Sequence, residues 1–363
     1  MTISAIAVHG ATGYTGRLVV AELARRGVTP VLVGRDPDRL NTVTAPGAER
    51  RVADLSDPTS LRAAFQDCAV VVNCAGPFAI HGEPVIRAAI DVGAHYVDIS
   101  GEQSYVMRVF DHFDEPAERA GVTVVPMAND GGFLADLLAA VTAARIDPHD
   151  PIDEVVLAHR TGGGGGLSRG SGRTALLARD MFAGGGLVYV DGRWRADLPA
   201  TCTAITFPGD PAPSTVAKAG FAEIATVPRH VAARRVEGVA EITFLARLAG
   251  LTPDVVERLP ESPPEHLRTA GRFTLVAEVT GRTSRARGVV EGTDTYGTTA
   301  VVAVQAACQL VVQGACQLVV QGACQLVVQG AKPGVLAPAQ AFTAGPFLDS
   351  LTSHGIRHTV ETG

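Results

Sequence analysis

Short apolar runs alternate with amphipathic segments through the first 145 residues of the chain. The runs have the length of strands and end near Gly, Pro, Asn or Asp, whereas the segments between them carry apolar residues at helical spacing. We expect six strands and four helices: strands near residues 3–8, 30–35, 49–53, 69–74, 94–100 and 121–126, and helices near 18–26, 59–67, 83–92 and 105–120. This rhythm predicts an α/β domain with a doubly wound parallel sheet over residues 1–145.

The pattern changes near residue 152. An Asp-Gly pair predicts a hairpin of residues 188–190 and 193–195. Residues 174–182 have the pattern of a helix. Further apolar runs predict strands at 152–161, 204–207, 239–248, 272–281 and 285–292. We therefore expect a second α+β domain with a mostly antiparallel sheet over residues 146–297, which could cover a ligand crevice or form a homodimer interface. Residues 298–363 are expected to be helical, with a last helix at 347–356, and to return to the first domain.

A glycine turn joins the first expected strand to the first expected helix. It reads GATGYTGR over residues 10–17, a G-x-x-G-x-x-G spacing. In this context Gly10 can turn sharply off the strand, Gly13 lets the backbone approach a pyrophosphate, and Gly16 lets the helix pack closely. The free N–H groups at the start of the helix would then face the phosphates. The alternative is an ordinary glycine-rich turn without a ligand.

The end of the second expected strand selects between the two nicotinamide cofactors. An acidic side chain there would bind the ribose 2′-OH of NAD, whereas an arginine accommodates the 2′-phosphate of NADP. Arg35 lies about twenty residues after the glycine turn, where this residue belongs, and its guanidinium suits a phosphate. Asp36 is the competing residue, but Asp36-Pro37-Asp38 also has the pattern of a helix start, so we expect NADP(H). Asp54 could contact the adenine or be a polar loop residue.

Polar residues gather where the fourth, fifth and sixth expected strands end. Ligands of open α/β sheets bind at the carboxyl ends of the strands, so Gly76 and Pro77 are expected to line the nicotinamide side. Alternation along the fifth strand places the polar side chains of Tyr96, Asp98 and Ser100 on one face. The candidate proton donors at these strand ends are Tyr96, Asp98, Glu102 and Asp130. For Asp98 and Asp130, a role as helix cap or turn residue explains the pattern equally well.

Five consecutive glycines at residues 162–166 precede a basic segment rich in hydroxyl groups. Ser168, Arg169 and Arg173 at the expected start of a helix could hold a carboxylate, or the phosphate of a carrier-bound substrate. The alternative is a flexible linker, and the sequence leaves both open. Arg229 and His230 are weaker candidates for substrate contacts, because a lone histidine in a loop is more often a surface residue.

Three segments together resemble the saccharopine dehydrogenase-like oxidoreductases. They are the glycine turn, the Gly34-Arg35 pair, and residues 74–102, CAGPFAIHGEPVIRAAIDVGAHYVDISGE. The resemblance is good over residues 1–145 and moderate over the last forty residues. It implies a Rossmann domain that binds NADP(H) around Gly10, Thr12, Gly13, Tyr14, Thr15, Arg35 and Gly76. The group includes saccharopine reductases and the trans-acting enoyl reductases of mycobacterial lipid synthesis. The turn at residues 127–136 matches the pattern of neither subgroup, so the substrate stays open.

Composition and charge narrow the class of protein. The net charge is −6 at pH 7 and no long basic run is present, which argues against a nucleic-acid binder. No C-x-x-C pair occurs among the six cysteines, which predicts neither a disulfide framework nor a metal site: Cys68, Cys74, Cys202, Cys308, Cys316 and Cys324. Cys74 is expected to fill space rather than act as a nucleophile. The early first strand leaves no room for a signal peptide, so we expect a cytoplasmic protein.

The unit Ala-Cys-Gln-Leu-Val-Val-Gln-Gly occurs three times without change at residues 307–330. Such identity is typical of a recent duplication, and the unit is too short for a solenoid. The helical pattern of residues 298–305 favours a helix that continues into the repeat, although the valine pairs and glycines would also suit a strand. The uncharged stretch at 298–331 is long enough to cross a bilayer, but its regularly spaced glutamines argue against insertion.

These observations together predict an NADP(H)-dependent oxidoreductase that moves a hydride to or from a C=N or C=O bond of a small molecule. One alternative is a trans-acting enoyl reductase that acts on a carrier-bound acyl chain. Another is a regulator that binds NADP without catalysis.

Overall fold

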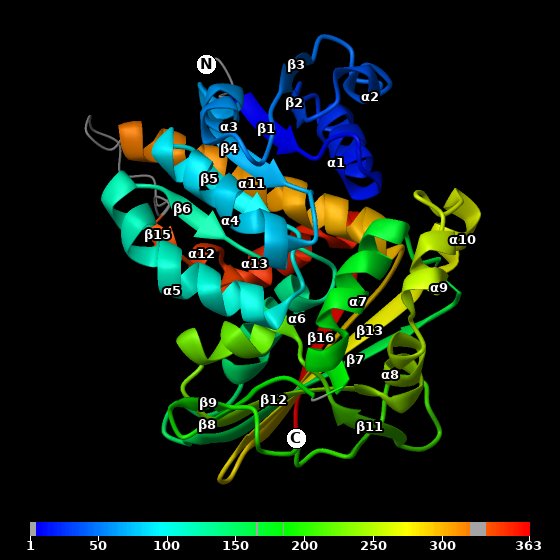
Figure 1. Cartoon of the computed structure of the whole chain (residues 1–363). Helices are drawn as coiled ribbons and strands as arrows, with labels where there is room; N and C mark the ends of the chain where they lie inside the picture. The colour runs from blue at the N-terminus through cyan, green and yellow to red at the C-terminus, as the bar shows by residue number, and fades with distance from the viewer. Residues whose placement is uncertain (1–4, 165, 184, 320–331) are drawn as a thin grey trace. The chain divides into compact units, whose positions relative to one another are not determined.

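The chain folds into two compact units, which are described separately. The computed structural model describes residues 5–164, 166–183, 185–319 and 332–363 (Figure 1). The first unit contains Met1–Ser100, Met107–Ala128 and Thr299–Leu336, and the second contains Gly101–Val106, Asn129–Thr298 and Ala337–Gly363. Both units are therefore built from segments that are far apart in the sequence.

A parallel sheet of seven strands forms the centre of the first unit, in the order β15-β6-β5-β4-β1-β2-β3. Every pair of neighbours is parallel, which confirms the predicted doubly wound sheet. The strand order reverses between β1 and β4, and ligands of such sheets bind at this switch point. The strands are β1 (Ala5–His9), β2 (Val31–Gly34), β3 (Glu49–Val52), β4 (Cys68–Asn73), β5 (His95–Asp98), β6 (Thr123–Val125) and β15 (Gly334–Val335).

Helices connect these strands close to the predicted positions, with two shifted starts. The helix expected from residue 18 begins at Tyr14, because Gly13 already serves as its N-cap. The helix expected from residue 83 begins at Phe78, so that Pro84 lies inside it rather than at its first turn. The helices are α1 (Tyr14–Arg25), α2 (Pro37–Asn41), α3 (Pro58–Phe65), α4 (Phe78–Asp91) and α5 (Gln103–Ala120), the last of which contributes residues to both units.

The second unit contains a sheet of nine strands whose main order is β10-β11-β12-β7-β13-β14-β16, with β8 and β9 beside β12. Among the strand pairs that this second sheet forms in the described residues, only β12–β7 is parallel, so the prediction of a mostly antiparallel sheet is confirmed. The strands are β7 (Ile152–Gly162), β8 (Val188–Val190), β9 (Arg193–Arg195), β10 (Ala204–Ile205), β11 (Ser214–Lys218), β12 (Ala233–Glu241), β13 (Arg272–Gly281), β14 (Arg285–Thr293) and β16 (Arg357–Thr362).

Two predictions for this unit were wrong. Residues 239–248 are not one strand, because β12 ends at Glu241 and α8 (Ile242–Ala249) follows at once. A short apolar run fits both the two-residue period of a strand and the 3.6-residue period of a helix, so the pattern alone could not distinguish a strand from a helix here. The chain end does not return to the first unit as a helix: after α13 (Ala344–Ser350) it forms β16, which pairs with β14. The sequence of this strand, Arg-His-Thr-Val-Glu-Thr, is mostly polar, so it lacks the apolar run by which the other strands were predicted.

Further helices complete the second unit, including several that the sequence did not reveal. The predicted helix at residues 174–182 is longer and begins at Arg169. The helices are α6 (Gly132–Ala143), α7 (Arg169–Ala183), α9 (Pro253–Arg258), α10 (Glu265–Ala270) and α12 (Pro338–Ala341), and the short turns are η1 (Ala222–Ala225), η2 (Val227–Arg229) and η3 (Thr352–His354). Helix α6 is apolar almost all round and nearly completely buried, as expected for the central helix of a unit.

The single buried charge on α6, Asp136, ties several segments of the second unit together. Its carboxylate accepts hydrogen bonds from Thr226 Oγ1 at 2.6 Å, His230 Nε2 at 2.9 Å and the Ala339 N–H at 2.9 Å. Burial lowers the pKa of the His230 imidazole, but the charge of Asp136 and the hydrogen bond to its carboxylate raise it by more. The net shift of the His230 pKa is therefore upward. His230, a candidate substrate contact from the sequence, is therefore committed to a structural ion pair.

Helix α11 (Thr295–Val319) contains the first repeat unit and part of the second. The helical prediction for the repeat is confirmed as far as Val319, and residues 320–330 lie outside the described part of the chain. Within that part, one segment, Thr295–Gln313, is long and apolar enough to cross a membrane. More than half of it, 56%, is buried inside the protein, as in the core helix of a globular unit.

The β13–β14 hairpin depends on Asp150, and this dependence should follow pH. The Asp150 carboxylate accepts hydrogen bonds from the hydroxyls and the backbone N–H groups of Ser284 and Thr283, and from the Arg282 N–H. These bonds hold the pKa of Asp150 well below its usual range, and the bond from the Ser284 hydroxyl contributes most. We expect Asp150→Asn to lower the melting temperature at pH 7. Because the folded pKa is depressed, the stabilisation is complete above the ordinary aspartate pKa and disappears as pH falls through the folded value, so the difference from wild type should shrink below about pH 4.

The measurement is a series of thermal melts between pH 7 and pH 2. Asp153→Asn is the matched control, since Asp153 makes only a partly exposed pair with Arg234 at 3.6 Å. A constant difference between Asp150→Asn and wild type across this range would contradict the role of the charged carboxylate.

Candidate active site at the carboxyl edge of the parallel sheet

The glycine turn closes tightly around one backbone carbonyl. Gly10 adopts a φ of 75°, which favours glycine, and its N–H donates to Val33 O at 3.0 Å. A Cβ on Gly16 would lie only 2.2 Å from Gly10 O, and one on Gly13 would lie 3.2 Å from the same oxygen. Any larger residue at position 16 would therefore force α1 away from the turn.

The amino end of α1 is left open for an anion. In the described structure its N-cap, Gly13, provides no side-chain hydrogen bond, and the first helical turn carries no acidic residue. Arg17 strengthens the turn, because its guanidinium donates to Thr12 O at 3.2 Å and to Thr42 Oγ1 at 2.7 Å. The half-buried turn residues therefore present backbone N–H groups and the positive end of a helix dipole, which together favour a phosphate.

Arg35 and Asp36 have different environments at the end of β2. Asp36 is the N-cap of α2 and accepts from the N–H groups of Asp38 at 2.9 Å and Arg39 at 3.1 Å, as its Asp-Pro pattern indicated. The Arg35 side chain is exposed, and no described residue makes a hydrogen bond or an ion pair with it. Bonds from Ser56, with a smaller contribution from the charge of Arg35, lower the pKa of Asp54. The cationic Arg35 thus remains available for a ligand phosphate.

A directional chain of hydrogen bonds crosses the carboxyl edge of the sheet. Burial lowers the pKa of His9, so its neutral imidazole donates Nδ1–H to Asn73 Oδ1 at 2.8 Å. The Asn73 amide donates to Tyr96 Oη at 3.0 Å, and Tyr96 Oη–H donates to Asp98 Oδ2 at 3.0 Å. The Asp98 carboxylate also accepts from the N–H groups of Ser100 and Met127. The chain therefore joins the ends of β1, β4 and β5 to the segment that follows β6.

This chain changes the interpretation of two predicted proton donors. Tyr96 and Asp98 are 0% exposed, and their polar atoms are bonded to protein groups. A role in direct contact with a substrate is therefore not supported for either residue, and we assign both to positioning. Sequence reasoning missed His9 and Asn73, although each is the polar last residue of a buried strand, which was a usable signal.

The residues after β4 lead directly into α4. The Ala75 N–H donates to Asn73 Oδ1 at 3.0 Å, and Pro77 is the N-cap of α4, so Gly76 and Pro77 are held at the strand end. Burial, and to a lesser degree Asp98, raises the pKa of Cys74 to about 12. The neutral thiol agrees with the interpretation of Cys74 as a space-filling residue.

The other two predicted proton donors, Glu102 and Asp130, belong to the second unit. Glu102 is buried and its carboxylate accepts from the Gly101 N–H at 3.0 Å. Asp130 is half-buried in the turn before α6, where the Gly131 N–H donates to Asn129 Oδ1 at 3.0 Å. Of these two carboxylates, that of Asp130 is the more accessible.

The predicted substrate residues at the start of α7 make contacts within the protein. Ser168 is buried, and its N–H donates to Tyr296 Oη at 2.9 Å. Arg169 Nε donates to Leu259 O at 3.0 Å, and Arg173 forms a two-pronged pair with Glu257, with a shortest distance of 2.8 Å. An anionic substrate would have to compete with Glu257, so binding by Ser168, Arg169 and Arg173 remains a prediction.

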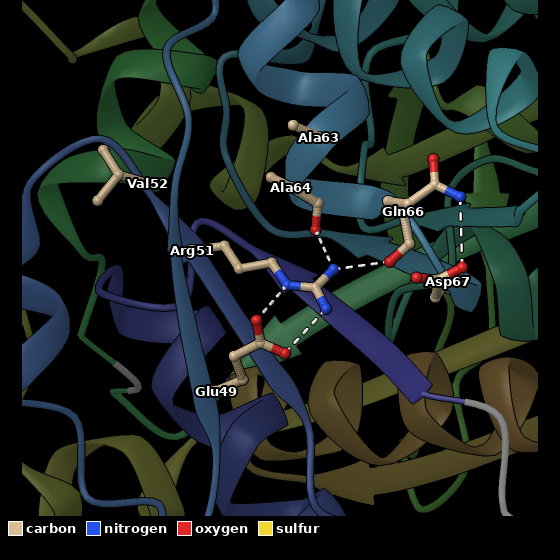
Figure 2. Close-up of a pocket in the computed structure, with 7 residues that line it drawn as sticks. All are labelled: Glu49, Arg51, Val52, Ala63, Ala64, Gln66 and Asp67. Atoms are coloured by element: carbon tan, nitrogen blue, oxygen red, sulfur yellow. Dashed lines mark hydrogen bonds and ion pairs between the residues drawn. The ribbon is translucent and has the colours of Figure 1, made fainter.

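A shallow surface depression of about 420 Å³ lies away from this edge. Figure 2 shows its lining, in which the Arg51 guanidinium is held by the Glu49 carboxylate and by the backbone carbonyls of Ala64 and Gln66. The lining follows the edge strand β3 from Glu49 to Val52 and includes the end of α3. None of the residues predicted to bind the cofactor or the substrate lines it.

The hydrogen-bond chain can be tested through Tyr96→Phe. The variant removes one hydroxyl and leaves Asn73 Nδ2 and Asp98 Oδ2 without that partner in a buried place. We expect the free energy of unfolding to fall by about 1–3 kcal/mol. The measurement is guanidinium unfolding followed by circular dichroism, with Tyr189→Phe as the control, since Tyr189 is half-buried and stacks edge-on with Trp194. Equal, small effects of both substitutions would contradict the chain.

Comparison with known proteins finds matches to the amino-terminal third of the chain. Residues 6–125 match the family "Saccharopine dehydrogenase NADP binding domain". A relative from Arabidopsis thaliana, named "Probable mitochondrial saccharopine dehydrogenase-like oxidoreductase", is 35% identical over 147 residues, 36% of this chain and 32% of the relative. The "Trans-acting enoyl reductase" of Mycobacterium bovis is 31% identical over 140 residues, 36% of this chain and 34% of the relative. The match thus spans about a third of these relatives.

The expectation of a cytoplasmic location is wrong on this comparison. The Arabidopsis relative is named as mitochondrial. Another relative, from Caenorhabditis elegans and 32% identical over 146 residues, 36% of this chain and 34% of the relative, is named "Lipid droplet localized protein". The early first strand, on which the cytoplasmic expectation rested, is therefore a poor guide to location.

One solved structure shares its fold with almost the whole chain. Saccharopine dehydrogenase (L-Glu forming) from Saccharomyces cerevisiae superposes with a TM-score of 0.62 at 13% identity, over 99% of this chain and 100% of that chain. At this identity the likeness concerns the fold alone. Residues 6–125 of the chain are therefore similar to the NADP-binding domain of saccharopine dehydrogenases, and the relatives that match this part are named as saccharopine dehydrogenase-like oxidoreductases.

Proposed function

We propose that this protein is an NADP(H)-dependent oxidoreductase that transfers a hydride to or from a C=N or C=O bond of a small molecule. The observation that carries the proposal is the open amino end of α1 above a turn in which Gly16 cannot accept a side chain. An enoyl reductase acting on a carrier-bound acyl chain is the second candidate, favoured by the mycobacterial relative of that name.

The residues of the first unit fit the cofactor. The N–H groups of Gly10 and Gly13 donate to Val33 O and Gly10 O, so these two glycines would shape the turn. Backbone N–H groups around Thr12, Tyr14, Thr15 and Gly16 would hold the pyrophosphate, and Arg35 would bind the 2′-phosphate. Gly76 and Pro77 would line the nicotinamide side, and Asp54, bonded to Ser56, would be a polar loop residue near the adenine. When bound, the cofactor supplies or accepts the hydride, and the protein supplies position and a proton.

The remaining chemistry falls to the chain's own side chains. Tyr96 and Asp98 act as positioning residues, because their hydrogen bonds fix the ends of β4 and β5 where the nicotinamide would lie. Of the other candidates, Asp130 is half-buried while Glu102 is buried, so Asp130 is the better candidate to exchange a proton with a substrate. A small-molecule substrate is the partner proposed, and a homodimer remains a proposal that oligomer measurements would test.

Arg35→Ala should weaken NADPH binding much more than NADH binding. Removing a charge-assisted contact to the 2′-phosphate should raise the NADPH dissociation constant by a factor on the order of 10–100, with NADH little changed. Fluorescence titration measures both. Asp36→Asn is the matched control, because it removes a charge from the adjacent residue and keeps an oxygen that can cap α2. Equal losses for both cofactors would remove the phosphate role of Arg35.

The reaction itself is tested by NADPH oxidation with imino acids, ketones and enoyl thioesters. Turnover of an imine or a ketone would support the first candidate, and turnover of an enoyl thioester alone would support the second. Tight NADPH binding without turnover of any of the three classes would contradict both enzymes.

A further inference from the structure

Strand β16 forms an edge of the nine-stranded sheet in the second unit (Figure 1). Among the described strands its one neighbour is β14, and the two strands are antiparallel. The Gly363 N–H donates to Arg285 O at 2.9 Å, which continues the β14–β16 ladder. Because bonding alternates between successive residues of an antiparallel ladder, His358 and Val360 direct their N–H and C=O groups away from β14. The sheet therefore offers backbone partners at this edge.

The side chains on one face of β16 carry two opposite charges. Arg357, Thr359 and Glu361 share this face and are exposed. No described residue makes a hydrogen bond or an ion pair with the side chain of Arg357 or Glu361. Four residues of strand span about 13 Å, so the two charges cannot pair with each other. Each is therefore available to a charge from outside the chain.

A row of alternating charge crosses this face of the sheet and ends at β16. Glu278 on β13 lies opposite Arg287 on β14, and Arg287 lies opposite Glu361 on β16. The Arg287 guanidinium donates to Glu278 at 2.7 Å rather than to Glu361. Arg287 and Glu361 also line a surface groove of about 360 Å³, which residues 206–210 border. A positive charge beyond Glu361 would continue the row past the edge of the sheet.

A second copy of the chain can supply that charge. If two β16 strands pair in antiparallel fashion about a two-fold axis at Thr359, Arg357 of each copy lies opposite Glu361 of the other. The same register sets His358 opposite Val360, and the backbone groups of these two residues face outward. A shift by one residue loses these backbone bonds, and a shift by two separates the opposite charges. Backbone bonding and charge thus select the same register.

We propose that β16 is a homodimer interface, at which two copies pair edge to edge and the sheets of their second units join. Each Arg357 pairs with Glu361 of the other copy, and symmetry makes this contact twice. Charged residues at a free edge prevent pairing with most strands, and here their order permits pairing with an identical one. The interface gives the homodimer a surface in the second unit, and it does not rest on cofactor binding.

Charge reversal tests the register. The measurement is sedimentation equilibrium of the full chain over a series of concentrations. Arg357→Glu and Glu361→Arg each set like charges opposite each other twice, so each should raise the dimer dissociation constant at least about tenfold. The double variant restores opposite charges and should dimerise like wild type. Arg193→Glu is the matched control, because it makes the same change of charge at an exposed residue of β9.

A mixture of the two single variants adds a second prediction. Arg357→Glu and Glu361→Arg complement each other across the axis, so together they should form a heterodimer more tightly than either forms a homodimer. A wild-type protein that stays monomeric at every concentration would overturn the interface. So would single variants that dimerise like wild type, or a double variant that dimerises no better than the single ones.

A cysteine on the axis tests the pairing directly. Thr359 directs its backbone groups at β14, so the two Thr359 residues would form a pair without mutual hydrogen bonds, with Cα atoms about 4.5 Å apart. A disulfide spans this distance. Thr359→Cys should therefore give a covalent dimer with diamide as the oxidant, seen on a non-reducing gel. Thr293→Cys, exposed on β14, is the control, and wild type shows the background of the native cysteines.

The gel also covers the case in which a charge variant fails to fold, as shown by its melting curve. No more covalent dimer from Thr359→Cys than from Thr293→Cys would contradict the pairing. NADPH titration of the same samples separates the interface from the proposed function. A monomer that binds NADPH would contradict the interface alone, and a dimer of the predicted register without NADPH binding would contradict the oxidoreductase alone.

Discussion

The close approach of α1 to the backbone of the glycine turn is the constraint on which the first unit depends. Gly10 O lies where a side chain at residue 16 would have to be, 2.2 Å from a Cβ placed there. The turn can therefore exist only with glycine at this position, and the same closeness leaves the first N–H groups of the helix directed at the space above the sheet. Because the strand order reverses between β1 and β4, this space is also where a ligand has access to the strand ends.

The hydrogen-bond chain from His9 to Asp98 connects the carboxyl ends of β1, β4 and β5. Four buried side chains on β1, β4 and β5 satisfy one another, and the last also accepts the Met127 N–H. In a low-dielectric interior such a network is stable only when every member is satisfied, and it then fixes the strand ends relative to one another. Residues that the sequence proposed for proton transfer thus serve to hold the edge on which a nicotinamide cofactor would lie.

Local sequence patterns predicted the local features well. The glycine turn, the helix start at Asp36-Pro37, the Asp-Gly hairpin and the parallel strands each follow from neighbouring residues, and they formed close to the expected places. Long-range partners could not be predicted, because they depend on sheet order and register. Tyr96 is buried because β5 lies between β4 and β6, and Arg173 is neutralised by Glu257, 84 residues away. His159 and Glu223, whose side chains form a buried hydrogen bond, meet only after β7 and η1 have packed, so neither stood out as a single residue in the sequence.

The central claim is that the tight glycine turn is the binding site for the pyrophosphate of NADP(H). Isothermal titration of NADPH into wild type, Gly16→Ala and Gly345→Ala tests it most directly; Gly345 lies in α13 of the second unit, where an added Cβ meets open space. Binding should be lost or weakened at least about 100-fold in Gly16→Ala and unchanged in Gly345→Ala. Wild-type NADPH affinity in Gly16→Ala, or no binding by wild type, would contradict the account.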